Sequence, residues 1–356
     1  MYLDPRFLKV VELSFAADSQ FWYAVIRDES DQPVAVACFS RYRVDVAMMA
    51  PPLIQKFVAN IRCIWPRFFQ FQMLFCGLPL SSAACYLAMD DRADHDRILA
   101  SLNETAMGIA RQIGVRLISF QQFSPALAMK LDGLIRYGFR KARSSYNYEL
   151  HGEFASFTDY LATLKGDTRW RIRRTLRRFD DAGLTCEQIR GRDGADRYFT
   201  PEVYQLYLNV LDQAKVRLEC KPIRFFQELA RQFPDESYFT FARQNERIVG
   251  FCCGLASGHQ YSLLVVGLDY SINRETNLYF NLVYRMMQQA LVPGVNLLHF
   301  GATADEFKQR LGCRGSWLSI YVKASKPVAQ LVLNRLFDKL FDTRDSTNAP
   351  PPSGTH

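Results

Sequence analysis

Residues 265–322 carry the clearest fold signal in this chain and read VVGLDYSINRETNLYFNLVYRMMQQALVPGVNLLHFGATADEFKQRLGCRGSWLSIYV. The apolar run from Tyr261 to Leu268 is rich in β-branched residues and indicates a strand that is buried on both faces. After a polar stretch, apolar residues recur at every fourth position, which predicts a helix with a wide apolar face: Leu278, Leu282, Met286 and Ala290. A second strand follows over residues 295–300, and a short helix then leads to a last strand. This order predicts a βαβ unit.

The polar stretch before the helix, residues 271–277, is where such a unit can meet an anion. Asn273 or Thr276 can cap the start of the helix, and Pro293-Gly294 ends it. The first turn of a helix offers unpaired backbone N–H groups and the positive end of the helix dipole. We therefore expect an anionic ligand at this loop.

Three groups of residues in this unit resemble motif A and the following strand of GNAT-superfamily acyltransferases. They are Gly267-Leu268-Asp269-Tyr270, Leu278-Tyr279-Phe280, and His299-Phe300-Gly301 with Glu306–Gly312. The closer resemblance is to the FemAB-like branch, which is linked with peptidoglycan biosynthesis and recognition. In that branch an aromatic-Gly pair is followed by an aromatic-Lys pair and a glycine, as in Phe300-Gly301, Phe307-Lys308 and Gly312. The resemblance is clearest over residues 150–325.

Composition and length favour a globular protein of two domains. The chain has 356 residues, of which 49% are apolar and 22% are charged. No apolar run approaches the roughly 18 residues of a membrane span, and residues 1–20 carry three acids instead of a signal-peptide pattern. The nine cysteines have no metal-binding spacing, so we expect free thiols and no metal site. These features predict a cytoplasmic protein.

The order of the predicted elements repeats in the two halves of the chain. Residues 113–120 align with residues 293–300, each followed by a helix, a glycine and a terminal strand, and Gly138 stands where Gly312 stands. The resemblance implies the same arrangement. We therefore predict an α/β (α+β) fold with two tandem GNAT-like domains, each a mixed twisted sheet flanked by helices.

The predicted boundaries divide the chain into four parts. Residues 1–147 form a degenerate first GNAT-like domain, because the segment 121–125 lacks the Gly and the aromatic-Lys pair, and residues 148–325 form the acyltransferase domain. Residues 326–342 form an amphipathic helix, and residues 343–356 form a disordered tail. The apolar face of this helix consists of Val328, Leu331, Val332, Leu336, Leu340 and Phe341. This face could pack on the core, join two subunits in a homodimer, or touch a membrane surface, and core packing is the commonest of these outcomes.

The net charge of +8 is concentrated in one predicted helix. Residues 165–178 hold seven basic residues and one acid. This helix could be a solvated surface paired with acids such as Asp180. The interpretation that we favour is a phosphate site built around Arg173 and Arg177, since guanidinium groups bind phosphate oxygens in bidentate fashion.

The resemblance also implies where an acyl donor would bind. The end of the strand, residues Val266, Gly267 and Leu268, would hold the donor near its carbonyl group, and the loop with Arg274 and Asn277 would face its phosphates. This loop departs from the usual Gln/Arg-x-x-Gly-x-Gly/Ala pattern because it contains no glycine. The departure disfavours tight binding of the pyrophosphate of CoA.

Candidate catalytic residues follow from the chemistry of amide formation, which needs a base, an acid and a stabilised oxyanion. By the resemblance, Lys308 would lie near the donor, although it could also be an exposed helix lysine. Tyr279 and His299 are acid or base candidates, and the alternative for His299 is a core histidine. The common GNAT tyrosine is replaced here by Phe307.

Three functions fit these features. The first is an N-acyltransferase that moves an acyl group from a CoA or carrier-protein thioester to a small-molecule or peptide amine, in a cleft between the domains. The second is an aminoacyltransferase that uses aminoacyl-tRNA, with the helix from Arg169 to Arg178 gripping the RNA. The same helix could instead bind an acyl carrier protein. The third is a recognition protein that kept the fold and lost catalysis.

Overall fold

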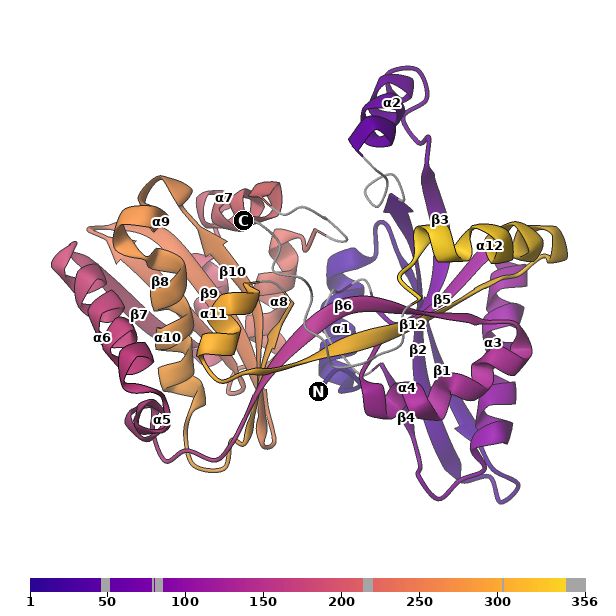
Figure 1. The fold of residues 1–356 in the computed structure, drawn as a ribbon, viewed down its shortest axis with the longest axis horizontal. Helices are drawn as coiled ribbons and strands as arrows, with labels where there is room; N and C mark the ends of the chain where they lie inside the picture. Colours follow the sequence, from indigo (N-terminus) through magenta and orange to yellow (C-terminus); the bar gives the residue numbers. More distant parts are fainter. Residues whose placement is uncertain (46–51, 79, 81–85, 214–219, 303, 344–356) are drawn as a thin grey trace.

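The computed structural model describes residues 1–45, 52–78, 80, 86–213, 220–302 and 304–343 (Figure 1). The elements of the first half are α1 Pro5–Phe15, β1 Gln20–Arg27, β2 Pro33–Asp45, α2 Pro52–Arg62, β3 Gln70–Cys76, β4 Leu87–Met89, α3 His95–Gln112, β5 Leu117–Phe123, α4 Pro125–Leu131 and β6 Arg140–His151. The elements of the second half are α5 Phe157–Thr163, α6 Gly166–Asp181, β7 Leu184–Arg190, α7 Pro201–Gln213, α8 Ile223–Gln232, β8 Ser237–Gln244, β9 Arg247–Ser257, β10 Gln260–Leu268, α9 Tyr270–Thr276, α10 Leu278–Ala290, β11 Leu297–Gly301, α11 Asp305–Arg310, β12 Arg314–Ala324 and α12 Pro327–Leu340.

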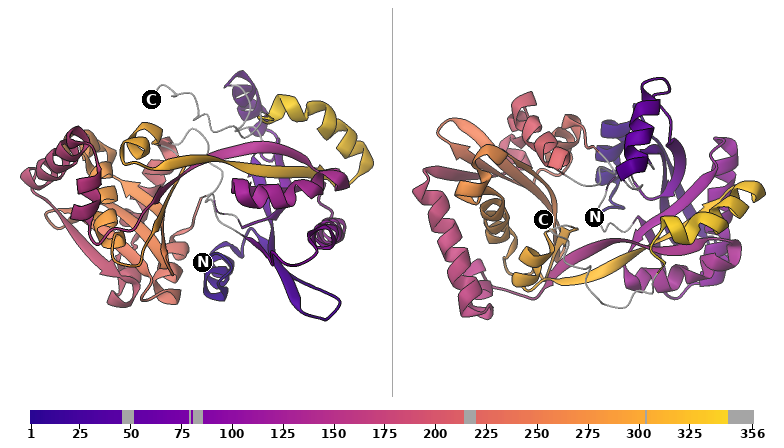
Figure 2. Two further views of the ribbon diagram at one scale, coloured as in Figure 1. Left: turned by 60° about the horizontal axis from the view of Figure 1, so that its bottom comes forward. Right: turned by 45° about the horizontal axis from the view of Figure 1, so that its top comes forward.

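One continuous 12-stranded sheet runs through the described residues in the order β1-β2-β3-β5-β12-β6-β11-β10-β9-β8-β7, with β4 beside β2. Two long antiparallel strands, β6 and β12, join the halves and lie side by side in every view (Figures 1 and 2). Each half lends its last strand to the other, because β12 pairs with β5 and β6 pairs with β11. The expected boundary at residue 147 therefore falls inside β6.

Both halves repeat the same core arrangement, which confirms the predicted fold of two GNAT-like units with mixed sheets. In each, two parallel strands are connected by a helix: β3 and β5 through α3, and β10 and β11 through α10. Gly138 and Gly312 precede the two long strands with φ of 88° and 77°, a left-handed conformation that favours glycine. Two parallel strands need a long connection, usually a helix, between them. The order strand, helix, strand in each half of the chain therefore accounts for both parallel pairs.

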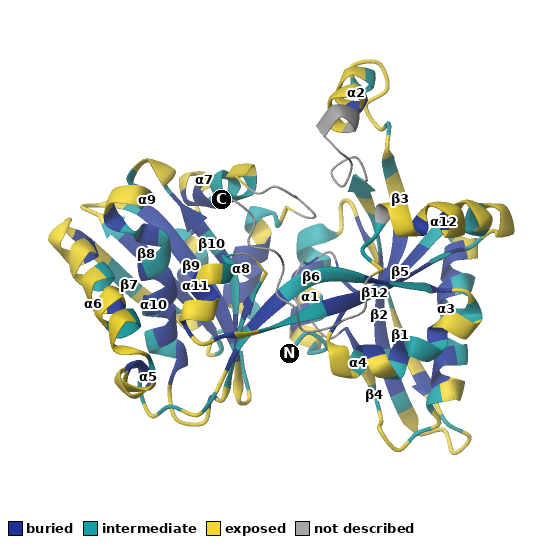
Figure 3. Cartoon of the chain, viewed as in Figure 1, coloured by how far each residue is buried: buried dark blue, intermediate teal, exposed yellow. Residues whose placement is uncertain are grey.

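The apolar cores lie between the sheet and its helices (Figure 3). Helix α10 buries the predicted residues Leu278, Leu282, Met286 and Ala290. A second cluster joins the halves, since Phe7 and Val10 of α1 pack with Phe225 of α8. Burial of several aromatic side chains, each contributing about 1.5–3 kcal/mol, holds α1 on the second half of the chain.

Helix α12 packs through a different face from the one predicted. Leu333 and Phe337 are buried against β6 and β12, whereas four of the predicted residues are exposed: Val328, Leu331, Val332 and Leu336. The partly buried Phe341 extends the packed stripe. The packed face meets the small side chains of Ala142 and Ala324, which leave room for Phe337. The side chain of Leu340 and residues 344–356 of the predicted tail lie outside the described residues.

The stretch 271–277 also differs from its prediction. It forms most of the helix α9 and is not an open loop. Asp269 caps this helix by accepting a hydrogen bond from the Ser271 amide. Among the described residues, no helix has both the length and the apolarity needed to cross a bilayer. The eight described cysteines are thiols outside any disulfide, and no cluster of three potential metal ligands forms in the described ranges.

Candidate active site

The strands β10 and β11 separate toward their carboxyl ends. They pair over three positions, the last of which is Ser262 with His299. Strand β10 then continues along β9 to Leu268, whereas β11 continues along β6, where Gly301 pairs with Tyr148. One extra residue in β10 near Leu264 forms a bulge against β9, and bulges bend the strand that carries them. The sheet therefore opens between the carboxyl ends of β10 and β11, which is the place where a βαβ unit commonly binds its ligand.

The end of β10 presents backbone N–H groups to this division. The Asp269 amide donates to the carbonyl of Val249 in β9 (2.8 Å). Because N–H directions alternate along an antiparallel pair, the amides of Val266 and Leu268 point away from β9, toward the side of β11. The Gly267 amide points to β9. The predicted donor-binding stretch thus offers two N–H groups, from Val266 and Leu268, and Gly267 serves packing, because a Cβ there would overlap the ring of Phe251.

One backbone amide in the first turn of α10 is already bonded by a side chain of the same region. Asn277 links α9 to α10 in the left-handed conformation, with φ of 55°. The Tyr279 amide donates to Oδ1 of Asn273 (2.9 Å). The Asn281 amide already bonds to the carbonyl of Asn277. Asn273 therefore is a cap, as predicted, and Thr276 instead donates its hydroxyl to the Ile272 carbonyl inside α9.

Lys308 is a buried residue of α11, only 2% exposed, and not a surface lysine. Its Nζ donates to three backbone carbonyls at the end of β11, those of Phe300 (2.9 Å), Gly301 (3.0 Å) and Ala302 (2.7 Å). Burial lowers the pKa of Lys308 to about 7, and the three carbonyl acceptors oppose this by favouring the ammonium form. Since all three N–H donors are used, Lys308 holds the chain that leaves β11.

His299 forms a polar pair that the sequence did not reveal. Its Nδ1 lies 3.1 Å from Oε1 of Glu149 in β6, and its Nε2 lies 3.3 Å from Oε1 of Gln260. The hydrogen bond from His299 is the main reason that the pKa of the Glu149 carboxyl is lowered. Both side chains are about one quarter exposed, so a substrate can reach them. The signal in the sequence for Glu149 is a charged residue between the apolar Tyr148 and Leu150.

Tyr279 lies apart from His299. Its ring packs with Phe280 and Phe307 on the side of the sheet covered by α10, and desolvation raises its pKa to about 12. His299 alternates along β11 with Leu298 and Phe300, which belong to that core, and therefore faces the opposite side. The structure does not bring these two predicted catalytic residues together.

The basic helix α6 is exposed along its arginine rows and packs on α10 through Ile172 and Phe179. Arg171 pairs with Asp167 (3.1 Å), and Asp180 is taken by Arg285 (3.0 Å). In the part of the chain that the structure describes, Arg173 and Arg177 have no acidic partner. The predicted pairing of the whole helix with acids is therefore incomplete. The predicted Arg274 lies exposed on α9.

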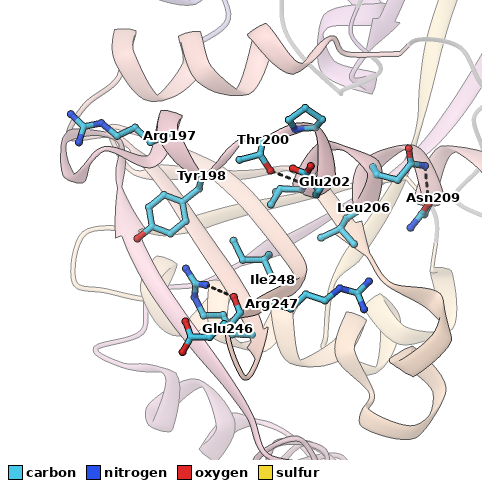
Figure 4. A pocket seen from close by; sticks show the side chains of 13 residues that line it. Arg197, Tyr198, Thr200, Glu202, Leu206, Asn209, Glu246, Arg247 and Ile248 are labelled. Carbon is cyan, nitrogen blue, oxygen red and sulfur yellow. Dashed lines mark hydrogen bonds between the residues drawn. The ribbon is translucent and has the colours of Figure 1, made fainter.

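A surface hollow lies between α7 and the hairpin of β8 and β9 (Figure 4). Two of the cations that line it are neutralised within the protein, because Arg243 pairs with Glu187 (3.1 Å) and Arg247 with Asp269 (2.9 Å). Asn209 in its lining donates to the carbonyl of Leu268 (3.1 Å), so the hollow adjoins the end of β10. None of the side chains predicted for the site lines it.

Comparisons with known proteins agree with this architecture. Residues 166–309 match the family described as an acetyltransferase (GNAT) domain. The structure of FemX is similar, with 11% identity, a TM-score of 0.59, and coverage of 92% of this chain and 93% of that chain. The C-terminal domain of a proposed lysylphosphatidylglycerol synthetase from Agrobacterium fabrum is 13% identical, with a TM-score of 0.52 and coverage of 90% and 89%.

A conserved protein of unknown function from Bacteroides thetaiotaomicron is similar as well, with 14% identity, a TM-score of 0.53 and coverage of 90% of both chains. No curated protein sequence matches this one. The chain therefore has the fold of GNAT acyltransferases, and residues 166–309 of its second half match the GNAT domain family. Its arrangement of two joined domains is similar to that of FemX.

Proposed function

We propose that this chain is an aminoacyltransferase that takes its acyl group from aminoacyl-tRNA and passes it to an amine acceptor. The observation that carries the proposal is α9. In place of a glycine-rich loop with free amides, residues 270–276 form a helix, and Asn273 occupies the Tyr279 amide at the start of α10. A CoA pyrophosphate needs those amides, and an aminoacyl ester of RNA does not.

Amide formation gives a role to the backbone amides and to the side chains that lie where β10 and β11 separate. The amine nitrogen attacks the ester carbonyl carbon, an amide bond forms, and the bond to the ribose oxygen breaks. The amides of Val266 and Leu268 would stabilise the oxyanion. The pair of His299 and Glu149 would accept the proton of the acceptor amine and return one to the ribose oxygen, because a carboxylate that bonds to an imidazole fixes its orientation.

The exposed arginines of α6 support an RNA donor. Arg173 and Arg177 lack acidic partners among the described residues, and Arg178 on the same helix is exposed too. Such guanidinium groups bind phosphates with an affinity that falls steeply with salt. Within the chemistry of this site, Lys308 is a positioning residue, since its three donors are occupied by the carbonyls that follow β11.

The test is binding of aminoacyl-tRNA to the purified full chain at low and high salt. We expect the double variant Arg173→Glu, Arg177→Glu to lose about 10²-fold or more in affinity at low salt. The matched control is Arg111→Glu, Arg116→Glu, which makes the same charge change on exposed arginines of the first half. If both variants lose the same affinity for aminoacyl-tRNA, the loss comes from the net charge of the protein and not from α6, which would contradict the proposal.

The thioester hypothesis has its own readout. If CoA thioesters raise the melting temperature and release free thiol when an amine is added, whereas tRNA has no effect, the donor is a thioester and our proposal is wrong. If neither donor binds and the chain still captures a partner, the recognition hypothesis takes its place.

A further inference from the structure

The segment that connects β2 to β3 exposes an unusual number of large apolar side chains. Helix α2 and the loop after it project from the first half as a finger (Figure 1). We define the finger as residues 55–71. Ile64 is 91% exposed, Phe57 63% and Trp65 61%, and Phe69 and Phe71 are exposed as well. Single exposed apolar residues are common on protein surfaces, but a contiguous group of this kind marks a contact site.

The charge of the same segment has one sign. Residues 46–72 contain no Asp or Glu, and they contain three cations, Lys56, Arg62 and Arg67. Lys56 and Arg67 are exposed beside the apolar residues. A surface that combines tryptophan and phenylalanine with unopposed cations is complementary to anionic headgroups above an apolar layer.

The base of the finger is firmly held. Both terminal nitrogens of Arg62 bond to the carboxylate of Asp45 at 2.7 Å, and its Nε donates to the carbonyl of Phe68 (2.9 Å). The rings of Trp65 and Phe68 are 5.5 Å apart, and the ring contacts continue to Phe69 and Phe71. The exposed rings are therefore presented in a fixed arrangement, which lowers the entropy cost of binding.

We propose that the finger docks on a membrane surface that contains anionic phospholipid, with Ile64 and Trp65 in the interfacial layer and Lys56 and Arg67 at the headgroups. A projecting tip can enter a bilayer interface, whereas it offers a second protein only a small contact. The uniform positive charge also disfavours a second copy of the same tip, since like charges repel. The inference is independent of the acyl donor.

The test is flotation of the full chain with vesicles of about one third phosphatidylglycerol and two thirds phosphatidylcholine, compared with pure phosphatidylcholine. We expect binding to the anionic vesicles and at least about a tenfold loss of partitioning for the double variant Ile64→Ser, Trp65→Ser. The matched control, Val25→Ser and Ile135→Ser, removes two apolar residues that are about half exposed in β1 and after α4. It should bind like the wild type.

A second variant tests the charges separately. Lys56→Glu, Arg67→Glu should abolish the preference for phosphatidylglycerol, because those side chains would then repel the headgroups. Melting temperatures of both finger variants should equal that of the wild type. No binding by the wild type, or unchanged binding by the Ile64→Ser, Trp65→Ser variant, would overturn the proposal. So would a wild-type dimer that this variant converts to a monomer, since the finger would then join two copies of the chain.

Discussion

The Nζ atom of Lys308 lies 2.9 Å from the carbonyl oxygen of Phe300, one residue before β11 ends. The same ammonium group bonds to the next two carbonyls, so one side chain fixes the direction in which the chain leaves the strand. That segment follows the strand which diverges from β10. The aromatic-Lys pair of the FemAB-like pattern therefore has a structural explanation in this chain, namely that Lys308 shapes one wall of the site.

Removing the ammonium group should destabilise the protein. Lys308→Met leaves three carbonyls without a donor, and we expect the free energy of unfolding to fall by about 2–3 kcal/mol, measured by urea denaturation. Arg310→Met on the same helix is the control, because Arg310 is exposed and its pair with Glu306 should contribute less than about 1 kcal/mol. Full stability of Lys308→Met together with lost turnover would instead make Lys308 a catalytic residue.

The pair of Glu149 and His299 should make stability depend on pH in the acid range. The pKa of Glu149 is lowered in the folded state, so the stabilisation is present above its ordinary value of about 4.5 and is lost as pH falls through the lowered pKa. Between roughly pH 5 and 3, the wild type should lose more stability than Glu149→Gln. Melting temperatures measured across this range provide the check.

The control for this pH effect is Glu153→Gln, a change at an exposed carboxylate just beyond β6. Its pH profile should run parallel to that of the wild type. A Glu149→Gln profile that also runs parallel to the wild type would show that the hydrogen bond to His299 contributes nothing to stability.

Gly267 should be intolerant of even a methyl group. In Gly267→Ala the added Cβ would overlap the ring of Phe251, and we expect a loss of about 1–3 kcal/mol in the free energy of unfolding. Gly108→Ala is the control, because a Cβ there meets nothing within 4 Å and alanine favours the interior of α3. Adding Phe251→Leu to Gly267→Ala should cost less than the sum of the two single changes. Additive costs would contradict the overlap.

The exchange of strands predicts that the halves do not fold independently. A fragment of residues 1–152 lacks β12, which lies between β5 and β6, and residues 153–356 lack β6, which lies between β12 and β11. Neither fragment should show a cooperative thermal transition by circular dichroism, whereas the two expressed together should associate. A cooperative transition in residues 1–152 alone would show that β12 is dispensable there.

Local patterns were sufficient for the elements and for the repeat. The spacing of Leu278, Leu282 and Met286 predicted α10, and α10 buries those residues. The prediction was possible because helical periodicity depends only on residues that are close in the sequence. The alternation of strands and helices likewise predicted both parallel pairs. The prediction of a loop at residues 271–277 is wrong for a local reason: the stretch contains no glycine, and it forms most of the helix α9.

Only the tertiary structure decided features that depend on residues far apart in the chain. The face of α12 that packs is set by Ala142 and Ala324, 182 positions apart, and not by the hydrophobicity of the helix. The partner of His299, Glu149, lies 150 positions away in the chain and directly opposite His299 in the sheet. The burial of Lys308 depends on where β11 ends. Side-chain environment is a property of contacts across the sheet, and periodicity in the sequence does not encode which strands meet.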